Sequence, residues 1–286
     1  MNNIELSTVY LPILDEVYKE ESKTSILDGD ETTVQKGNNG EIKIAKLDMD
    51  ALGDFDRNTG YTKGSTKFTW ETVRYDKERS QELRIDRLDN DEALKAPFAR
   101  LSSEFLRTKV IPETDAARFA KLASAENIGT SAETLDTGEK VVASLRKTTG
   151  QMDDAEVPTE SRILFITSTM LGLVEDLDTT KSKKVLEGFS QIIKVPQTRF
   201  YTAITLNDGT ENYGFRKADG GYPLNYMVVE KSAAVTAMDQ YIKYFTPDQD
   251  QNGDDNVFKY RNNNLYGHCY ENKRAGIHAS YDNSAQ

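Results

Sequence analysis

The sequence has few of the residues on which enzyme and metal sites are usually built. Its 286 residues include one cysteine, Cys269, and two histidines, His268 and His278. A single thiol excludes an internal disulfide and a four-thiolate zinc site. Neither histidine belongs to an H-x-x-x-H or H-E-x-x-H spacing. Adjacent strand residues point to opposite faces, so His268 and Cys269 are predicted to be structural rather than a nucleophile–base pair.

Long apolar runs and clustered positive charge are also missing. No stretch approaches the roughly 20 apolar residues of a membrane-spanning helix. The opening MNNIELSTVY has neither the basic nor the apolar region of a secretory signal. The chain has 36 Lys and Arg against 47 Asp and Glu, a formal net charge of −11. Phosphate binding depends on clustered Lys and Arg, so nucleic-acid binding is not expected to be the main activity.

Motifs for nucleotide binding and nucleophilic catalysis are absent too. The chain contains no G-x-S-x-G, G-x-G-x-x-G or Walker sequence. TGEK at 137–140 lacks the upstream glycine and the following Ser or Thr of a phosphate loop. Carboxylates occur throughout an acidic chain, so their spacing selects no glycosidase pair. We therefore predict no catalytic residue, no cofactor-binding residue and no metal ligand.

One segment, PDQDQNGDD at 247–255, imitates the start of a calcium loop. Asp248, Asp250, Asn252 and Gly253 occupy its first, third, fifth and sixth positions. The twelfth position should be a bidentate Glu, but here it is Lys259, which would repel calcium. The flanking residues are typical of strands, so this segment is predicted to be a solvated hairpin loop.

The first half of the chain contains segments that are predicted to form no core of their own. Residues 1–39 are polar, with one stretch of helical spacing interrupted by Pro12, and are expected to lie on another surface, in the same subunit or the next. EIKIAKLD, KFTWETVRY and ELRID alternate as strands, around a long loop MDALGDFDRNTGYTKG. Phe68 and Trp70 share one strand face. Because a two-stranded hairpin is marginal alone in water, this projection needs a partner surface.

The remaining residues alternate between helical and strand patterns. Leu94, Phe98, Leu101 and Phe105 form one apolar stripe of a helix in which Pro97 predicts a kink. Pro112 opens a further helical stretch. Residues 126–235 are predicted to be a compact α/β region. Its predicted helices lie around 136–150 and at TMLGLVEDL. Its predicted strands are a central buried strand SRILFITS, a strand pair broken at Pro196 and an apolar strand LNYMVVE. Residues 236–286 are predicted to be β again.

The segments KLDMDALGDFDRNTGYTKGSTKFTWET, IDRLDNDEA and VIPETDAARFAKLAS resemble the major capsid proteins of tailed bacteriophages, particularly those of Gram-positive hosts. The similarity runs from LPILDEVY to ENKRAGIHAS and is strongest over residues 41–125. It implies an α+β fold of the Hong Kong 97 type. It also implies five parts, which are an N-terminal arm at 1–39, an extended β-hairpin loop at 40–87, a spine helix with the first part of a peripheral domain at 88–130, an axial domain at 131–235, and the remainder of the peripheral domain at 236–286.

The resemblance implies a structural protein rather than an enzyme. Subunits would assemble through pentamers and hexamers into an icosahedral virion shell in the host cytoplasm. The shell would enclose double-stranded DNA without specific binding, and the partners would be scaffold and portal proteins and a decoration protein. The initial Met favours a separate scaffold protein over a removed scaffolding region. Some relatives join subunits through a Lys–Asn isopeptide bond, for which Lys63 or Lys67 and the triplet Asn262, Asn263 and Asn264 are the candidates.

Two other functions stay open at this stage. The first is an encapsulin-type compartment, which shares the fold and encloses cargo enzymes instead of a genome. The second, from a different class, is a soluble acidic hydrolase built on the α/β region. That reading lacks a nucleophile–base constellation and leaves the β-projection unexplained.

Overall fold

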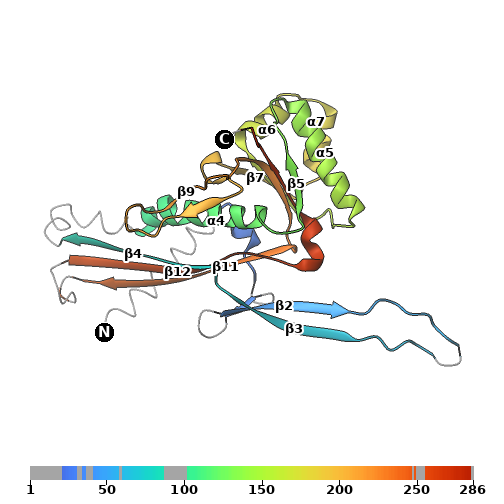
Figure 1. The fold of residues 1–286 in the computed structure, drawn as a ribbon, viewed down its shortest axis with the longest axis horizontal. Coiled ribbons are helices and arrows are strands. Elements are labelled where there is room, and N and C mark those ends of the chain that lie inside the picture. The colour runs from blue at the N-terminus through green and yellow to red at the C-terminus, as the bar shows by residue number, and fades with distance from the viewer. Residues whose placement is uncertain are drawn as a thin grey trace.

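Three sheets and a short ribbon organise the part of the chain that the structure describes (Figure 1). The computed structural model describes residues 21–30, 34–36, 41–57, 60–86, 102–246, 248 and 255–284. A five-stranded sheet with helices forms the upper part of the molecule, and a long three-stranded sheet lies below it. A third sheet carries a hairpin that projects away from both. No helix of the described residues is long and apolar enough to cross a membrane.

The five-stranded sheet is mixed, with the order β5-β13-β10-β6-β7. Its strands are β5 (Gly129–Ala132), β6 (Arg162–Thr167), β7 (Gln191–Val195), β10 (Leu224–Glu230) and β13 (Ile277–Tyr281). Every residue of β6 and β10 is buried. Both strands are inner ones with layers packed on their two faces, which accounts for their nearly continuous apolar sequences. The prediction that SRILFITS is a central, doubly covered strand is therefore confirmed.

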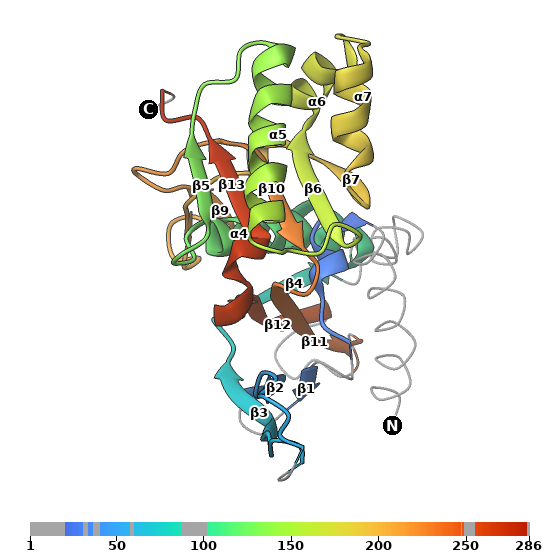
Figure 2. The same ribbon diagram turned by 90° about the vertical axis from the view of Figure 1, so that its right-hand side faces the viewer.

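Helices cover one face of this sheet, as Figure 2 shows. They are α5 (Gly138–Asp154), α6 (Ser168–Glu175) and α7 (Thr180–Glu187). Val141 and Leu145 of α5 pack with Leu164 and Ile166 of β6 in one buried cluster. The side chain of Thr137 caps α5 by accepting a hydrogen bond from the Lys140 N–H. The helices predicted around 136–150 and at TMLGLVEDL are present, whereas α7 was not predicted.

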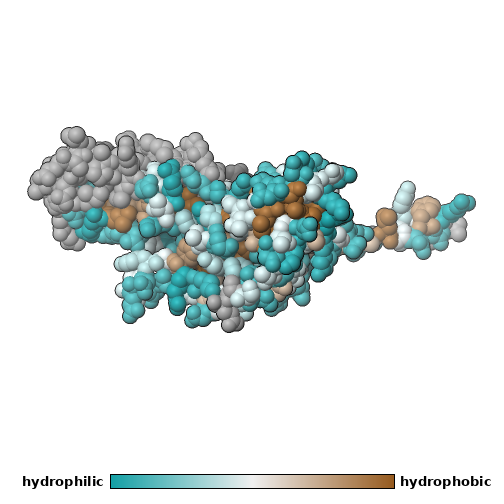
Figure 3. Space-filling model, turned by 90° about the horizontal axis from the view of Figure 1, so that it is seen from above, coloured by the Kyte–Doolittle hydropathy of each residue, from teal (hydrophilic) through white to brown (hydrophobic). Residues whose placement is uncertain are grey.

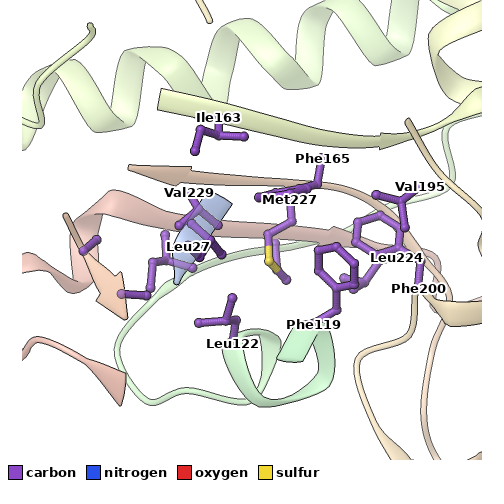
Figure 4. Packing of buried hydrophobic residues seen from close by; sticks show 14 residues of the cluster. Leu27, Phe119, Leu122, Ile163, Phe165, Val195, Phe200, Leu224, Met227 and Val229 are labelled. Atoms are coloured by element: carbon purple, nitrogen blue, oxygen red, sulfur yellow. The ribbon is translucent and has the colours of Figure 1, made fainter. Parts of the chain in front are cut away.

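The other face of the sheet packs on helix α4 (Ile111–Ala123) and on the short turn η1 (Ser25–Leu27) (Figure 4). Phe119 contacts Phe165 and Phe200 edge to face, with ring centroids 5.2 and 4.7 Å apart. Leu27 enters the same cluster and is almost fully buried. Residues 21–30 of the predicted arm therefore lie on their own subunit, which was one of the two surfaces expected for them.

Residues 102–123 form one continuous helix that contains a π-helical turn, η2 (Leu106–Val110). Proline lacks an N–H and its ring crowds the carbonyl four residues earlier, so the wider turn directly before Pro112 accommodates it. This helix packs on a sheet of order β11-β12-β4. The strands are β4 (Lys77–Asp86), β11 (Ala234–Phe245) and β12 (Asp255–Cys269). The predicted stripe Leu94, Phe98 and Leu101 and the predicted kink at Pro97 lie outside the described residues.

The third sheet has the order β1-β2-β3 and ends in the projecting hairpin. Its strands are β1 (Val34–Lys36), β2 (Glu41–Met49) and β3 (Thr66–Arg74). Residues 50–57 and 60–65 belong to the long connection between β2 and β3, as the sequence predicted. A small ribbon completes the fold, formed by β8 (Ile204–Leu206) and β9 (Phe215–Lys217).

Three predicted groupings of strands were wrong. ELRID was placed with the projecting hairpin, but β4 pairs with β12 from Asp86↔Asp255 to Lys77↔Asn264. The two strands around Pro196 do not pair, because β7 joins β6 and β8 joins β9. The final strand β13 joins β10 and β5 rather than the sheet of β11 and β12. The alternation of side chains predicts that a strand exists. It does not predict which strand lies beside it, because the hydrogen bonds between strands join backbone groups.

Candidate interaction surfaces

The base of the projecting hairpin is anchored on the lower sheet. Ile42 and Ile44 of β2 are fully buried against Val235 of β11 and Leu265 of β12. Because side chains alternate along a strand, these two isoleucines give β2 one apolar face at its start. The apolar contact fixes where the hairpin leaves the molecule.

Asp76 holds the turn between β3 and β4. Its carboxylate accepts hydrogen bonds from the Lys121 ammonium at 3.0 Å and from the Tyr266 N–H at 2.8 Å. Its own N–H donates to the Asn264 carbonyl at 2.8 Å. These bonds connect the hairpin, α4 and β12 at a single residue. The chain direction at this corner is therefore set by charge-assisted contacts as well as by apolar packing.

Beyond its base the hairpin exposes apolar side chains. Six of the nine large hydrophobic side chains exposed in the described residues lie between positions 47 and 68, which are Leu47, Met49, Leu52, Phe55, Tyr61 and Phe68. Figure 3 shows apolar atoms gathered on this projection, clear of the rest of the molecule. An exposed apolar concentration of this kind marks an interaction surface.

Aromatic pairs give this surface a defined shape. Phe55 and Tyr61 meet edge to face with centroids 5.1 Å apart, held by paired hydrogen bonds between Asp56 and Gly60. Phe68 and Trp70 form a second edge-to-face pair at 5.5 Å, which confirms that they share a face of β3. Preorganised aromatic side chains lose little conformational freedom on binding, so such pairs suit an interface.

A buried acid joins residues 22–24, α4 and the upper part of the molecule. Asp115 is fully buried and accepts hydrogen bonds from the Ser22 hydroxyl at 2.7 Å, the Thr24 hydroxyl at 2.6 Å and the Arg199 guanidinium at 3.0 Å. The buried Arg118 pairs with Asp28 at 2.6 Å. We call Ser22, Thr24, Asp115 and Arg199 the Asp115 clasp. No sequence pattern marks this cluster, because an acid in a helix ordinarily faces water.

A Ser–His pair was also not identified from the sequence. Ser131 Oγ lies 3.0 Å from His278 Nε2. The histidine is only 3% exposed, its ring stacks on Tyr226, and burial lowers its pKa to about 4. A Cβ added at Gly129 would lie 2.3 Å from Nδ1, so the ring edge is tightly enclosed. The enclosure leaves no space beside the ring for a substrate, which favours a structural role.

The structure separates His268 from Cys269, as predicted. His268 faces the hairpin, with Nε2 3.9 Å from a Glu71 carboxylate oxygen. Cys269 packs against the core cluster of Phe119 and Leu122. Burial lowers the pKa of His268 and raises the pKa of Cys269, so both favour their neutral forms.

The remaining candidate residues do not converge on a site. Most of the calcium-like segment lies outside the described residues, but its flanks are the strands β11 and β12, and Lys259 pairs with Glu82 at 2.8 Å. The amide oxygens of Asn262, Asn263 and Asn264 are buried, which argues against the proposed isopeptide bond. Within the described ranges, no group of three or more His, Cys, Asp or Glu residues is placed to hold a metal ion.

Comparison with protein-family models finds no match, and neither does comparison with curated proteins. Solved structures do match over most of the chain. A structure of Mycobacterium phage Che8 is 14% identical and covers 89% of each chain with a TM-score of 0.54. The capsid of cyanophage P-SCSP1u is 15% identical and covers 87% of this chain and 85% of its own, also with a TM-score of 0.54.

A third match comes from a particle that is not described as a phage. The virus-like particle from Pyrococcus furiosus is 10% identical, covers 95% of this chain and 99% of its own, and has a TM-score of 0.54. These identities are low, so the likeness concerns the arrangement of the elements. The chain has the Hong Kong 97-type fold of phage capsid proteins.

Proposed function

We propose that this chain is the major capsid protein of a tailed bacteriophage, a structural protein whose activity is self-assembly. Its subunits form pentamers and hexamers that close into an icosahedral shell around double-stranded DNA. The observation that carries the proposal is the apolar, aromatic hairpin beyond residue 45, which the described residues of its own chain leave uncovered. Similar weak contacts repeated over many identical subunits would make a closed shell stable.

The parts of the fold take roles in this proposal. The hairpin of β2 and β3 is the extended loop, and the helix at 102–123 is the spine. The five-stranded sheet with α5, α6 and α7 is the axial domain, and the β11-β12-β4 sheet belongs to the peripheral domain. Scaffold, portal and decoration proteins are the further partners. The overall charge of −11 supports a shell that encloses DNA without binding it tightly.

An encapsulin-type compartment is the second candidate. It is favoured by the match to the Pyrococcus furiosus virus-like particle, which covers almost the whole of both chains. The two candidates share the assembly of the shell and differ in its contents. Nucleic acid inside purified particles supports the capsid, whereas a cargo protein bound to the inner wall supports the compartment.

The test compares the full chain with a variant that lacks residues 49–64. Both are expressed and examined by light scattering and negative-stain electron microscopy. We expect capsomers, tubes or closed shells from the full chain and a folded but non-assembling subunit from the deletion. Circular dichroism controls for folding. Shells of normal size from the deletion variant would contradict the role given to the hairpin.

A further inference from the structure

A pocket of about 480 Å³ lies between α5 and α7, two of the helices that cover one face of the five-stranded sheet (Figure 2). Arg146, Thr149 and Asp153 line it from α5, where their spacing places them on one side of the helix. Lys181 and Lys184 line it from α7, three residues apart. We call this cavity the α5–α7 pocket. Its volume falls within the range of about 300–1,000 Å³ that is typical of small-molecule sites.

Arg162 and Asp153 line the pocket as an ion pair. The Arg162 side chain is only 2% exposed, and its Nη1 lies 2.8 Å from a carboxylate oxygen of Asp153. The same guanidinium donates hydrogen bonds to the carbonyls of Val157 and Pro158. Asp153 is the only acid among the described residues that line the pocket. Its charge is matched by Arg162 and therefore does not offset the other cations.

Three further cations line the pocket without acidic partners. Arg146, Lys181 and Lys184 are exposed, and none of them is ion-paired within the described part of the chain. The whole chain has a net charge of −11, so three uncompensated cations around one cavity are a local reversal of charge. A concave site lined by charges of one sign attracts and concentrates ions of the opposite sign. The α5–α7 pocket is therefore suited to an anionic ligand.

The donors around the pocket suit phosphate groups. A guanidinium such as that of Arg146 can donate two parallel hydrogen bonds to a phosphate, and the ammonium groups add charge-assisted bonds. Lys181 also belongs to the first turn of α7, where the positive end of the helix dipole favours an anion. Among the described residues of the lining none is aromatic, so a nucleotide base would find no stacking surface there. The chemistry of the pocket selects the phosphate part of a ligand.

The surroundings of the pocket favour a compact anion over a continuous polyanion. Asp154, Glu160 and Glu187 are exposed, and each adjoins a lining residue in the sequence. A DNA duplex lying across the two helices would meet these acids, which oppose the binding of its phosphates. A short chain of phosphates held inside the pocket would contact the cations and avoid the acids around it.

We propose that the α5–α7 pocket binds a short polyphosphate chain, either free or as part of a nucleotide, through Arg146, Lys181 and Lys184. The site lies within one subunit, so it goes beyond the proposed function and does not depend on assembly. Arg162 holds the Asp153 carboxylate in its ion pair and so limits repulsion of the ligand. The bound phosphates join α5 to α7 and stabilise the folded subunit, because they bind the folded chain and not the unfolded one.

Calorimetric titration of the full chain with sodium tripolyphosphate tests this site. A metal-free buffer of about 0.15 M ionic strength screens exposed charges that lie more than about 8 Å apart. The test variant is Lys181→Gln with Lys184→Gln. The matched control is Lys140→Gln with Lys183→Gln, which removes as much charge from the same two helices, at ion-paired positions outside the pocket. We expect one site per subunit in the wild type and the control, and binding at least about tenfold weaker in the test variant.

Parallel titrations with ATP and with a short DNA duplex identify the source of the phosphates. Equal affinity for ATP and tripolyphosphate supports recognition of the phosphate chain alone, and tighter binding of ATP assigns the site to a nucleotide. Absence of binding of both ligands to the wild type overturns the proposal. An equal loss of affinity in the test and control variants, or tighter binding of the duplex than of tripolyphosphate, also overturns it. Self-assembly is measured separately by particle formation, so none of these failures is a failure of the proposed function.

Discussion

Removing the apolar side chains at the hairpin tip should abolish assembly without destabilising the subunit. The proposed variant is the triple substitution Leu52→Ser, Phe55→Ser and Tyr61→Ser. All three side chains are largely exposed in the isolated chain, at 104%, 59% and 88%. Substitutions at such exposed positions usually change the free energy of unfolding by within about 0.5 kcal/mol. The subunit should therefore unfold at the same denaturant concentration as the wild type.

The expected effect on association is much larger, because the proposed assembly buries these side chains only between subunits. Full burial of one Leu or Phe side chain contributes about 1.5–3 kcal/mol. Three such side chains contribute about 5–9 kcal/mol to each hairpin contact. Every 1.4 kcal/mol changes an equilibrium constant about tenfold, so this contact should weaken by a factor of about 10³ to 10⁶. A closed shell repeats the loss at every subunit.

The assay measures particle yield against protein concentration by light scattering, with negative-stain electron microscopy of the products. The conservative triple Leu52→Met, Phe55→Tyr and Tyr61→Phe keeps the apolar area and should assemble. Lys63→Ser with Lys67→Ser removes charge from the same hairpin and should also assemble. Normal particles from the serine triple would refute the reasoning that the hairpin is covered by another subunit.

The remaining predictions concern buried groups. Asp115→Ala leaves the Arg199 guanidinium and two hydroxyls without their acceptor, so urea unfolding should show a loss of about 3–5 kcal/mol. The control Asp136→Ala, which breaks the exposed pair with Lys140, should leave the urea midpoint close to that of the wild type. The pKa of His278 falls from 6.5 to about 4 on folding. Below pH 6.5 the unfolded chain binds a proton at His278 that the folded chain does not bind. About 3 kcal/mol of the free energy of unfolding, present above pH 6.5, should therefore be lost by pH 4. An equally steep fall in the free energy of unfolding of His278→Gln would contradict this. Trp70→Ala should lower the melting temperature of assembled particles, because full burial of the Trp70 side chain at a contact contributes about 2–3 kcal/mol. An unchanged melting temperature would count against docking of the β3 face that carries Phe68 and Trp70.

Local pattern was sufficient wherever the relevant contacts are close in sequence. The alternation in KFTWETVRY placed Phe68 and Trp70 on one face, and their rings do meet. The apolar run ILFI within SRILFITS predicted a strand covered on both sides, and all six residues of β6 are buried. In both cases the signal is the period of side chains along a strand, which depends on the chain alone.

Long-range pairing could not be read from the same pattern. β4 follows the hairpin in sequence, yet it pairs with β12, nearly 180 residues later. β13 returns to the five-stranded sheet, between β5 and β10. Hydrogen bonds between strands join backbone groups that every residue possesses, so the sequence of one strand does not specify the partner. Packing of the whole molecule decides it.

The sequence by itself determined that this protein is acidic, has one thiol, and carries strands of a projecting hairpin that is marginal on its own. Only the tertiary structure decided which apolar residues remain uncovered and which acids are buried. Ile42 and Ile44 pack against Val235 and Leu265. The large apolar side chains from Leu47 to Phe68 stay exposed within the part of the chain that the structure describes. Asp115 is buried because the segments at 22–24 and Arg199 converge on it from distant parts of the chain. Burial and pairing are properties of the assembled contacts, and those contacts exist only when the chain has folded.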